Sequence, residues 1–487
     1  MNDVKKIICY HTHMELNDYR PGECIRLERA LSIWDKIYFK YVPVAYVYDE
    51  ERQALLLPAG ITASWVSNMT GRPIEMNYDA DEYENIHLRI NKPPRDLLQV
   101  ESLKFLAGKD EYAGYDKYPQ LVLNLDTDTG KTYIAMAQIA YRAMRTMVIV
   151  HSEFLENQWE EKFLKDTNID PKRICKIAGS PKCLSIIKSP KKYKQYAIFI
   201  IKHATIHSFG TNYGWNMVGE LFKALRIGLK IYDEAHKEFA NIIHTDCYTN
   251  TKYTYYLTAT FGRSNTDEMK IYLECFKNIP KFEQKKLPDY GGKPHIAYLC
   301  IFYSTDPTIL QLSHMKNAYG FNRTAYAKYQ LDDDPRFFSI LRSLVKKTVV
   351  DGGLKTLLLM TTIRGIDEFA DYISNEFPDI EIGLYHSKIK DQIAKDDAKN
   401  KQLIISTQKS LGEGADIAGL KAVINTESFK STIVTEQIIG RLRRPPDGSG
   451  CIYIEIVDKA FQTLRNQQKT RERFMKKMVS TIQYVKM

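Results

Sequence analysis

Short apolar runs alternate with longer stretches of mixed polarity between Arg95 and Lys281. The runs that predict strands are 121–125 (LVLNL), 147–150 (MVIV), 196–202 (YAIFIIK), 229–234 (LKIYDE) and 255–260 (YYLTAT). Continuous apolar strands separated by amphipathic, helix-like stretches are typical of a parallel sheet that helices cover on both faces. A stretch rich in Pro, Gly and Lys at 280–294 interrupts the pattern, and we expect the sheet to end near it.

The same alternation returns at 355–362 (KTLLLMTT) and predicts a second α/β lobe. A helix is expected over 364–377, followed by strand-like runs at 380–386, 401–407, 420–427 and 451–458. The segment between the lobes combines a strand-like run at 296–303 with a helix-like run at 336–350. We expect this segment to join the lobes and to supply the first helix of the second lobe.

The two ends of the chain have other patterns. Runs at 44–50 and 53–61 predict two strands around a polar turn, and 23–37 predicts a helix, which together indicate a small α+β domain. The last stretch is basic and predicts a helical tail, either a solvated helix or a nucleic-acid contact. The predicted domains are 1–90 (accessory, for substrate recognition), 91–282 (first lobe), 283–350 (linker and start of the second lobe), 351–458 (second lobe) and 459–487 (tail).

Composition narrows the class of protein. A chain of 487 residues with 44% hydrophobic and 26% charged residues is globular and too long for one compact core. No apolar run approaches the roughly 20 residues that span a bilayer, and the polar start is unlike a secretory signal, so no membrane partner is expected. Eight scattered cysteines without a CxxC pair predict reduced thiols and no structural metal. The net charge of +10 is compatible with a polyanionic partner.

The strand at 121–125 leads into a candidate phosphate-binding loop. The loop comprises Asp126, Thr127, Asp128, Thr129, Gly130, Lys131 and Thr132 and precedes a helix-like stretch. In such loops backbone N–H groups and a helix N-terminus cradle phosphate oxygens, while Lys131 would reach the β- and γ-phosphates and Thr132 would bind Mg²⁺. The full pattern GxxxxGK[ST] fails at its first position, where Leu125 stands in place of glycine.

Two further elements follow in the first lobe. The sequence DEAH ends an apolar run, so that Asp233 could hold Mg²⁺ and Glu234 could accept a proton from the attacking water. On the next predicted strand, Thr258 and Thr260 are short hydroxyl residues that could relay the nucleotide state.

The second lobe carries the last element, QIIGRLRR at 437–444. Arg441 and Arg444 are three apart, which predicts one shared helix face and a pair of arginine fingers for a γ-phosphate. Upstream, Gly414 would allow close backbone approach and Asp416 could accept a ribose hydroxyl.

These elements, in this order over residues 95–455, resemble superfamily 2 helicases, and DEAH places the resemblance in the DExH branch. The resemblance implies two tandem RecA-like lobes with an ATP site between them, and ATP and Mg²⁺ as cofactors. It assigns the adenine contact to Gln99, although the spacing from Arg95 is one residue longer than in the family. Other implied ATP-site residues are Lys131, Thr132, Asp233, Glu234, Gly414, Asp416, Gln437, Arg441 and Arg444; implied coupling residues are His236, Thr258 and Thr260; implied nucleic-acid contacts are Ser152, Thr205, Thr362 and Thr407.

A narrower resemblance is to helicases of phages and large DNA viruses, including branch-remodelling helicases of T-even phages and transcript-release helicases of poxviruses. It rests on LLLPAGI at 55–61, on TATFGRS at 258–264 with Arg263 in place and Phe261 where proline is usual, and on the short basic tail. It implies a cytoplasmic protein, in a bacterial host for a phage, or in the virion or host cytoplasm for a large DNA virus.

The leading hypothesis is an ATP-dependent DNA helicase or translocase that remodels forked or branched duplexes in replication, recombination or repair, with 3′-to-5′ movement implied by the family. An RNA helicase or viral transcript-release factor is the first alternative. A non-hydrolysing nucleic-acid clamp is the alternative from another class, supported by Leu125 and Asp128 in the loop. A restriction-type translocase subunit is a further alternative: no PD…ExK nuclease block follows the lobes, which argues against an attached nuclease, although a partner chain could carry one.

Overall fold

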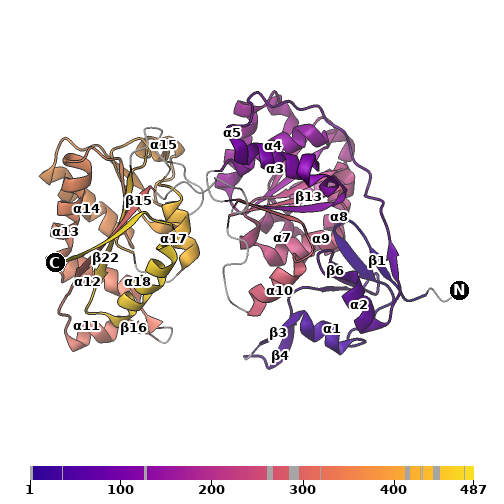
Figure 1. Ribbon diagram of the computed structural model, residues 1–487, viewed down its shortest axis with the longest axis horizontal. Coiled ribbons are helices and arrows are strands. Elements are labelled where there is room, and N and C mark those ends of the chain that lie inside the picture. Colours follow the sequence, from indigo (N-terminus) through magenta and orange to yellow (C-terminus); the bar gives the residue numbers. More distant parts are fainter. Residues whose placement is uncertain are drawn as a thin grey trace. The chain divides into compact units, whose positions relative to one another are not determined.

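The computed structural model describes residues 4–35, 37–125, 129–259, 267–284, 295–317, 320–411, 417–427, 429, 431–442, 450–476 and 478–487 (Figure 1). The chain forms two compact units, Met1–Tyr290 and Gly291–Met487. Each unit is centred on its own parallel sheet of seven strands. None of the described helices has both the length and the apolar character that a bilayer crossing requires.

The sheet of the first unit confirms the five predicted strands and adds two. Its strands are β8 (Gln120–Asn124), β9 (Thr146–Val150), β10 (Ile174–Ile177), β11 (Ile198–Lys202), β12 (Leu229–Tyr232), β13 (Tyr253–Thr258) and β14 (Lys281–Glu283). All of the pairings are parallel, in the order β10-β11-β9-β12-β13-β8-β14. The additional strands, β10 and β14, are short and each contains a lysine, so that no continuous apolar run marks them.

Helices cover both faces of this sheet, and we call the sheet with these helices the first lobe. They are α3 (Leu97–Ala107), α4 (Lys131–Arg142), α5 (Glu153–Asp166), α6 (Gly179–Lys188), α7 (His203–Tyr213), α8 (Trp215–Leu225), α9 (Phe239–Tyr248) and α10 (Asp267–Cys275). Along β9, Val148 packs in the core with α3, α4 and α5, whereas Met147 packs in the core with α6 to α9. Successive side chains of a strand point to opposite faces, so one strand serves both cores. Figure 1 shows helices on either side of this sheet.

The N-terminal region packs on the second of these cores. Its sheet has the order β5-β6-β2-β1-β7 and consists of β1 (Ile7–Cys9), β2 (His13–Leu16), β5 (Val47–Asp49), β6 (Ala54–Pro58) and β7 (Ile74–Met76). The two predicted strands are confirmed as β5 and β6, which pair antiparallel. Leu16 and Leu55 are buried in the same cluster as the residues of α6 to α9.

The helix predicted over 23–37 is wrong in its second half. Helix α1 (Ile25–Ala30) ends early, and β3 (Ser32–Asp35) pairs antiparallel with β4 (Lys40–Pro43). The Asp35 carboxylate accepts the backbone N–H groups of Ile37 and Tyr38, at 2.7 and 3.1 Å, which closes a turn in place of another helical turn.

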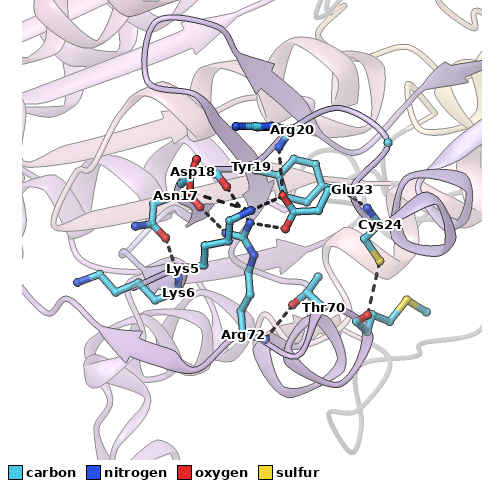
Figure 2. Close-up of polar contacts among 12 residues, drawn as sticks. Lys5, Lys6, Asn17, Asp18, Tyr19, Arg20, Glu23, Cys24, Thr70 and Arg72 are labelled. Atoms are coloured by element: carbon cyan, nitrogen blue, oxygen red, sulfur yellow. Dashed lines mark hydrogen bonds and ion pairs between the residues drawn. The ribbon is translucent and has the colours of Figure 1, made fainter. Parts of the chain in front are cut away.

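A buried arginine ties the start of α1 to the end of α2 (Ala63–Thr70). Figure 2 shows Arg72, only 3% exposed, donating from Nη2 to Glu23 Oε1 at 2.6 Å and to the Asp18 carbonyl at 3.1 Å. Lys5 Nζ lies 2.8 Å from the same carboxylate. Although desolvation opposes it, hydrogen bonding by Arg72 and Lys5 lowers the pKa of Glu23 to about 2. The carboxylate is therefore the counter-ion that a buried guanidinium requires.

The second unit repeats the α/β plan, and we call it the second lobe. Its sheet is parallel, in the order β19-β20-β18-β21-β22-β15-β23, with strands β15 (Ile296–Tyr303), β18 (Thr356–Leu359), β19 (Ile382–Tyr385), β20 (Leu403–Ser406), β21 (Ala422–Asn425), β22 (Cys451–Asp458) and β23 (Thr481–Lys486). Its helices are α11 (Ile309–His314), α12 (Arg323–Asp332), α13 (Phe337–Val345), α14 (Ile363–Glu376), α15 (Gln392–Ala398), α16 (Gln408–Leu411), α17 (Thr432–Ile439) and α18 (Gln462–Met475). A short hairpin joins β16 (Lys316–Asn317) to β17 (Gly320–Phe321).

The strand-like run at 296–303 and the helix-like run at 336–350 are confirmed as β15 and α13. Strand β15 belongs to the sheet of this lobe, because it pairs with both β22 and β23. The expectation for the tail needs correction. The tail is helical only through Met475, and Thr481–Lys486 forms the edge strand β23. The pairing of Ala297 with Thr481 is a long-range contact, which local charge and periodicity do not reveal.

Candidate active site

The phosphate loop ends on a glycine that has no room for a side chain. Gly130 has φ of +86° and precedes the first residue of α4. A Cβ there would lie 2.2 Å from Gln99 Nε2, which donates to the Thr129 carbonyl at 3.1 Å. Gln99 therefore contacts the loop backbone directly, despite its unusual spacing from Arg95. Residues 126–128 of the predicted loop lie outside the described residues.

The departure from the glycine pattern has a structural reason. Leu125 is fully buried in the core beside α4, so this position is filled by packing. Its carbonyl accepts a hydrogen bond from Lys131 Nζ at 3.1 Å. Lys131 and Thr132 open α4 and are each 8% exposed. The loop thus places an ammonium group at a helix N-terminus, where phosphate oxygens are favoured.

The paired carboxylates follow strand β12. Asp233 is 6% exposed, and its Oδ2 accepts a hydrogen bond from Trp159 Nε1 at 2.8 Å. Burial, and then the charge of Glu234, raise the pKa of Asp233. Glu234 has φ of +52°, a left-handed conformation that is strained for a residue with a side chain. The Glu234 backbone N–H donates to Asp233 Oδ1 at 3.0 Å, so the two residues are joined locally at the end of the strand.

His236 lies between Glu234 and strand β13. Its Nδ1 is 3.0 Å from Thr258 Oγ1 and 3.4 Å from Glu234 Oε2. Thr258 ends β13 and is fully buried. The structure thus brings together His236 and Thr258, two of the three predicted coupling residues, whereas Thr260 lies outside the described residues.

Helix α5 links the two halves of this site. Trp159 bonds to Asp233, and one turn later Lys162 Nζ donates to Thr132 Oγ1 at 3.3 Å. No sequence motif marks these two residues. The spacing of three places both side chains on one helix face. The contact of Trp159 with Asp233 depends on β9 lying beside β12, and that of Lys162 with Thr132 depends on the packing of α5 against α4.

The predicted nucleic-acid contacts of the first lobe follow β9 and β11, which are neighbours. Ser152 caps α5, and its hydroxyl accepts the Leu155 N–H at 3.4 Å. Thr205 lies in the first turn of α7 and is only 7% exposed. His151 Nε2 is 3.0 Å from Lys237 Nζ, and burial followed by the Lys237 charge lowers the pKa of His151 to about 4.

In the second lobe, the predicted contacts Thr362 and Thr407 also follow neighbouring strands, β18 and β20. Thr362 caps α14 by accepting the Gly365 N–H at 3.1 Å, and Thr407 donates to Ser410 Oγ at 2.8 Å. Each hydroxyl therefore lies at the start of a helix.

The structure describes only part of the residues predicted for the ATP site in the second lobe. Gln437 lies within α17, but its side chain is outside the described part, as are Gly414, Asp416 and Arg444. Arg441 lies beyond the end of α17 at Ile439. The predicted helix face shared by Arg441 and Arg444 is therefore wrong at Arg441, because the helix ends before Gly440.

The oxygen donors of the first lobe fit Mg²⁺. Thr132 offers a hydroxyl oxygen, and Asp233 offers the oxygens of a buried carboxylate. Oxygen ligands of this kind are the ones that Mg²⁺ prefers. No group of three or more metal-ligating His, Cys, Asp or Glu side chains occurs among the described residues.

Comparisons with known proteins agree with this arrangement. Residues 89–263 match the family described as Type III restriction enzyme, res subunit. Residues 338–445 match the helicase conserved C-terminal domain. These ranges contain the phosphate loop and DEAH in one case and the Arg441 region in the other.

Two viral relatives cover most of the chain. A protein of Acanthamoeba polyphaga mimivirus, provisionally named ATP-dependent RNA helicase L396, is 25% identical over 79% of this chain and 68% of its own length. Transcript termination protein A18 of Yaba monkey tumor virus (strain VR587) is 24% identical over 80% of this chain and 78% of its own length.

A solved yeast structure shares the fold. S. cerevisiae Dbp5 bound to RNA and ADP BeF3 covers 81% of this chain and 90% of its own, at 13% identity and a TM-score of 0.53. T4 UvsW covers 99% of both chains at 16% identity and a TM-score of 0.36. The likeness to Dbp5 agrees with the tandem RecA-like lobes of this fold. The two family matches and the viral relatives identify the chain as a superfamily 2 helicase, similar to a mimivirus helicase and to a poxvirus transcript termination protein.

Proposed function

We propose that the protein is an ATP-dependent DNA helicase or translocase that acts on forked or branched duplexes, with 3′-to-5′ movement, in replication, recombination or repair. One observation carries the enzymatic part: Lys131 and Asp233 follow β8 and β12 of one sheet, and α5 contacts both Thr132 and Asp233. Ligands of open parallel sheets bind at the carboxyl ends of strands. The implied setting is the cytoplasm of a bacterial host or of a host cell of a large DNA virus.

In the proposed mechanism, Lys131 balances the phosphate charge and Gln99 holds the loop backbone in place. Glu234 accepts the proton of the attacking water, and Thr132 and Asp233 hold Mg²⁺. Bound Mg²⁺ would neutralise charge on the phosphate oxygens. The second-lobe residues Asp416, Gln437, Arg441 and Arg444 are proposed to complete the ATP site.

The contact of His236 with both Glu234 and Thr258 supports a coupling role. If hydrolysis changes the hydrogen bonding of Glu234, the His236 imidazole would transmit this change to Thr258 at the end of β13. The hydroxyls of Ser152, Thr205, Thr362 and Thr407 are the proposed contacts to the sugar–phosphate backbone. Such contacts position a strand without reading its sequence.

The choice of DNA is supported by the restriction-enzyme family that matches the first lobe. The second candidate is an RNA helicase or transcript-release factor, and the names of the mimivirus and poxvirus relatives favour it. DNA and RNA share the phosphates that the proposed hydroxyl contacts would bind and differ at the 2′-hydroxyl, which none of the assigned residues is proposed to contact. The motor residues alone therefore do not choose between the two polymers.

The test is a panel of ATPase and unwinding measurements on forked DNA, blunt duplex DNA, single strands and matching RNA. We expect forked and single-stranded DNA to stimulate ATPase, and a fork with a 3′ tail to be unwound. Stimulation by RNA alone would refute the DNA proposal in favour of the second candidate. Absence of ATP hydrolysis on every polymer would support a nucleic-acid clamp.

A further inference from the structure

The β3–β4 hairpin exposes an unusual set of large side chains. At its tip, Ile37, Tyr38 and Phe39 are 79%, 71% and 77% exposed. On its strands, Trp34 and Tyr41 are 48% and 44% exposed. Contiguous exposed apolar groups of this size usually mark a binding surface. Figure 1 shows the hairpin at the margin of the first unit.

The hairpin holds its aromatic rings in a defined arrangement. Trp34 pairs with Tyr41 across the strands, and their rings meet edge to face with centroids 5.1 Å apart. The Asp35 carboxylate fixes the turn by accepting two backbone N–H groups. Phe39, whose ring is exposed, takes a left-handed conformation with φ of +49°, which is strained for a residue with a side chain.

The base of the hairpin is anchored on both sides. The Arg72–Glu23 pair secures the chain immediately before α1, as Figure 2 shows, and α1 leads into β3. Strand β3 also contacts α10 of the first lobe. The hairpin is therefore a fixed part of the unit that contains the phosphate loop and the DEAH residues.

Positive charges lie against the exposed rings. The Arg29 guanidinium is 5.2 Å from the Tyr41 ring centroid, and Lys40 Nζ is 5.8 Å from that of Tyr38. Neither cation forms an ion pair within the part of the chain that the structure describes. Flat aromatic faces beside unneutralised cations match a ligand with planar rings and regularly spaced negative charges, which is single-stranded nucleic acid.

We propose that the β3–β4 hairpin stacks on unpaired bases at the junction between single strand and duplex, with Arg29 and Lys40 contacting the adjacent phosphates. The inference rests on the proposed nucleic-acid motor and assigns a substrate-contacting surface to its accessory region. Stacking on the first unpaired bases would hinder their re-pairing, so the hairpin would favour strand separation.

The test compares wild type with the double variant Tyr38→Leu/Phe39→Leu, which keeps apolar surface but removes the flat rings. Tyr118→Leu is the matched control, because Tyr118 is 48% exposed elsewhere on the first lobe. A fork with 2-aminopurine as its first unpaired base reports stacking by quenching without ATP. We expect quenching with wild type and Tyr118→Leu, and at least fivefold weaker fork binding by the double variant.

ATPase stimulated by oligo(dT), or by oligo(U) if only RNA is active, separates this inference from the proposed function. Stimulation near the wild-type level in the double variant, together with about tenfold slower unwinding, is the expected result. Unchanged quenching and unwinding in the double variant would overturn the hairpin proposal while leaving the motor intact. Hairpin-dependent quenching without stimulated ATPase would uphold the hairpin and refute the motor.

Two further measurements keep the proposal testable if the double variant misfolds. A fork carrying 5-iodouracil at the first unpaired position should crosslink wild type within Trp34–Tyr41, whereas crosslinking elsewhere would refute the assignment. Binding of wild type to vesicles of phosphatidylserine, with no quenching of the fork, would identify the surface as a lipid contact and overturn the proposal.

Discussion

The two lobes share one sheet topology but differ in chemistry. Numbering the strands of each sheet along the chain, both have the order 3-4-2-5-6-1-7. After the first strand of the first lobe, the chain forms the phosphate loop. After the corresponding β15, Thr305 instead closes onto Asp458, whose carboxylate accepts the Thr305 N–H at 3.1 Å. The second lobe has no lysine in the place of Lys131.

A similar difference follows the fifth strand. In the first lobe β12 leads to Asp233 and Glu234, and in the second lobe β21 leads to Thr426 and Glu427. Glu427 accepts the backbone N–H of Gln408 at 2.6 Å, and burial raises its pKa to about 7. Glu427 is thus engaged within its own lobe. The two lobes repeat one strand order, and in the proposed mechanism the residues just beyond the strands give only the first lobe the groups for ATP hydrolysis.

The largest expected effect separates the two glutamates. We expect Glu234→Gln to lower kcat for ATP by at least about 100-fold while nucleotide binding is kept, because a general base contributes about 10²- to 10⁴-fold. Glu427→Gln is the matched control and should stay within about threefold of wild type. Steady-state ATPase and fluorescent-nucleotide binding measure both quantities. Equal losses in the two variants would contradict the asymmetry of the lobes.

The seventh strands of the two sheets should differ in their contribution to stability. Phe282 of β14 is 5% exposed, whereas Tyr484 of β23 is 51% exposed. Phe282→Ala should therefore lower the free energy of unfolding by about 3 kcal/mol through the cavity it leaves. Tyr484→Ala should cost below about 1 kcal/mol. Urea denaturation measures both values. A larger loss of stability in Tyr484→Ala than in Phe282→Ala would contradict the prediction that the buried edge strand contributes more.

The contact between α5 and Asp233 predicts a smaller effect on catalysis. Trp159→Phe removes the indole N–H that bonds to the carboxylate, so we expect about a tenfold loss in kcat/KM and a higher half-saturating Mg²⁺ concentration. Trp215→Phe on α8 is the control for the same substitution. An unchanged Mg²⁺ requirement in Trp159→Phe would argue against α5 as the support of this site.

The smallest effect concerns the residue after the fourth strand, His203 in the first lobe and Thr407 in the second. Burial lowers the pKa of His203 from 6.5 to about 3. Below pH 6.5 the unfolded chain binds a proton that the folded chain does not, so stability falls by up to about 1.4 kcal/mol per pH unit. His203→Phe should lose less stability between pH 6.5 and 5.5, by about 1 kcal/mol.

Urea midpoints across this range provide the measurement. His207→Phe, on the exposed side of α7, should keep the wild-type pH dependence. If His203→Phe kept it as well, His203 would not be the group responsible.

The sequence allowed prediction of those parts of the fold that local patterns encode. Apolar runs predict β8, β9, β11, β12 and β13 because each is continuous. They do not reveal β14, where Phe282 is the only apolar residue of the strand and its burial depends on the distant β8. The sequence predicts helix over β3, the first strand of the hairpin, because the helix-like pattern of 23–37 includes it. In the structure Asp35 closes a turn through backbone contacts that no sequence pattern shows.

The candidate site divides in the same way. Gly130, Lys131, Asp233 and Glu234 are found from sequence, since each follows a recognisable strand. Trp159 and Lys162 are not, because their partners depend on which strands are neighbours. The contact of Gln99 with Thr129 is likewise not predictable from sequence, because the spacing of Gln99 from Arg95 differs from that of the family. The structure shows the contact because α3 places Gln99 beside the loop.

The position of β8 has a consequence for biosynthesis. This strand lies between β13 and β14, both of which leave the ribosome long after it. Until Tyr253–Thr258 has been made, β8 has no neighbour in the sheet, and the loop that it leads into has no fixed anchor. We expect nascent chains stalled before β13 to bind no ATP, although the phosphate loop is already complete in sequence. Strand β8 is thus the first strand of this sheet to be synthesised and among the last to pair with its neighbours.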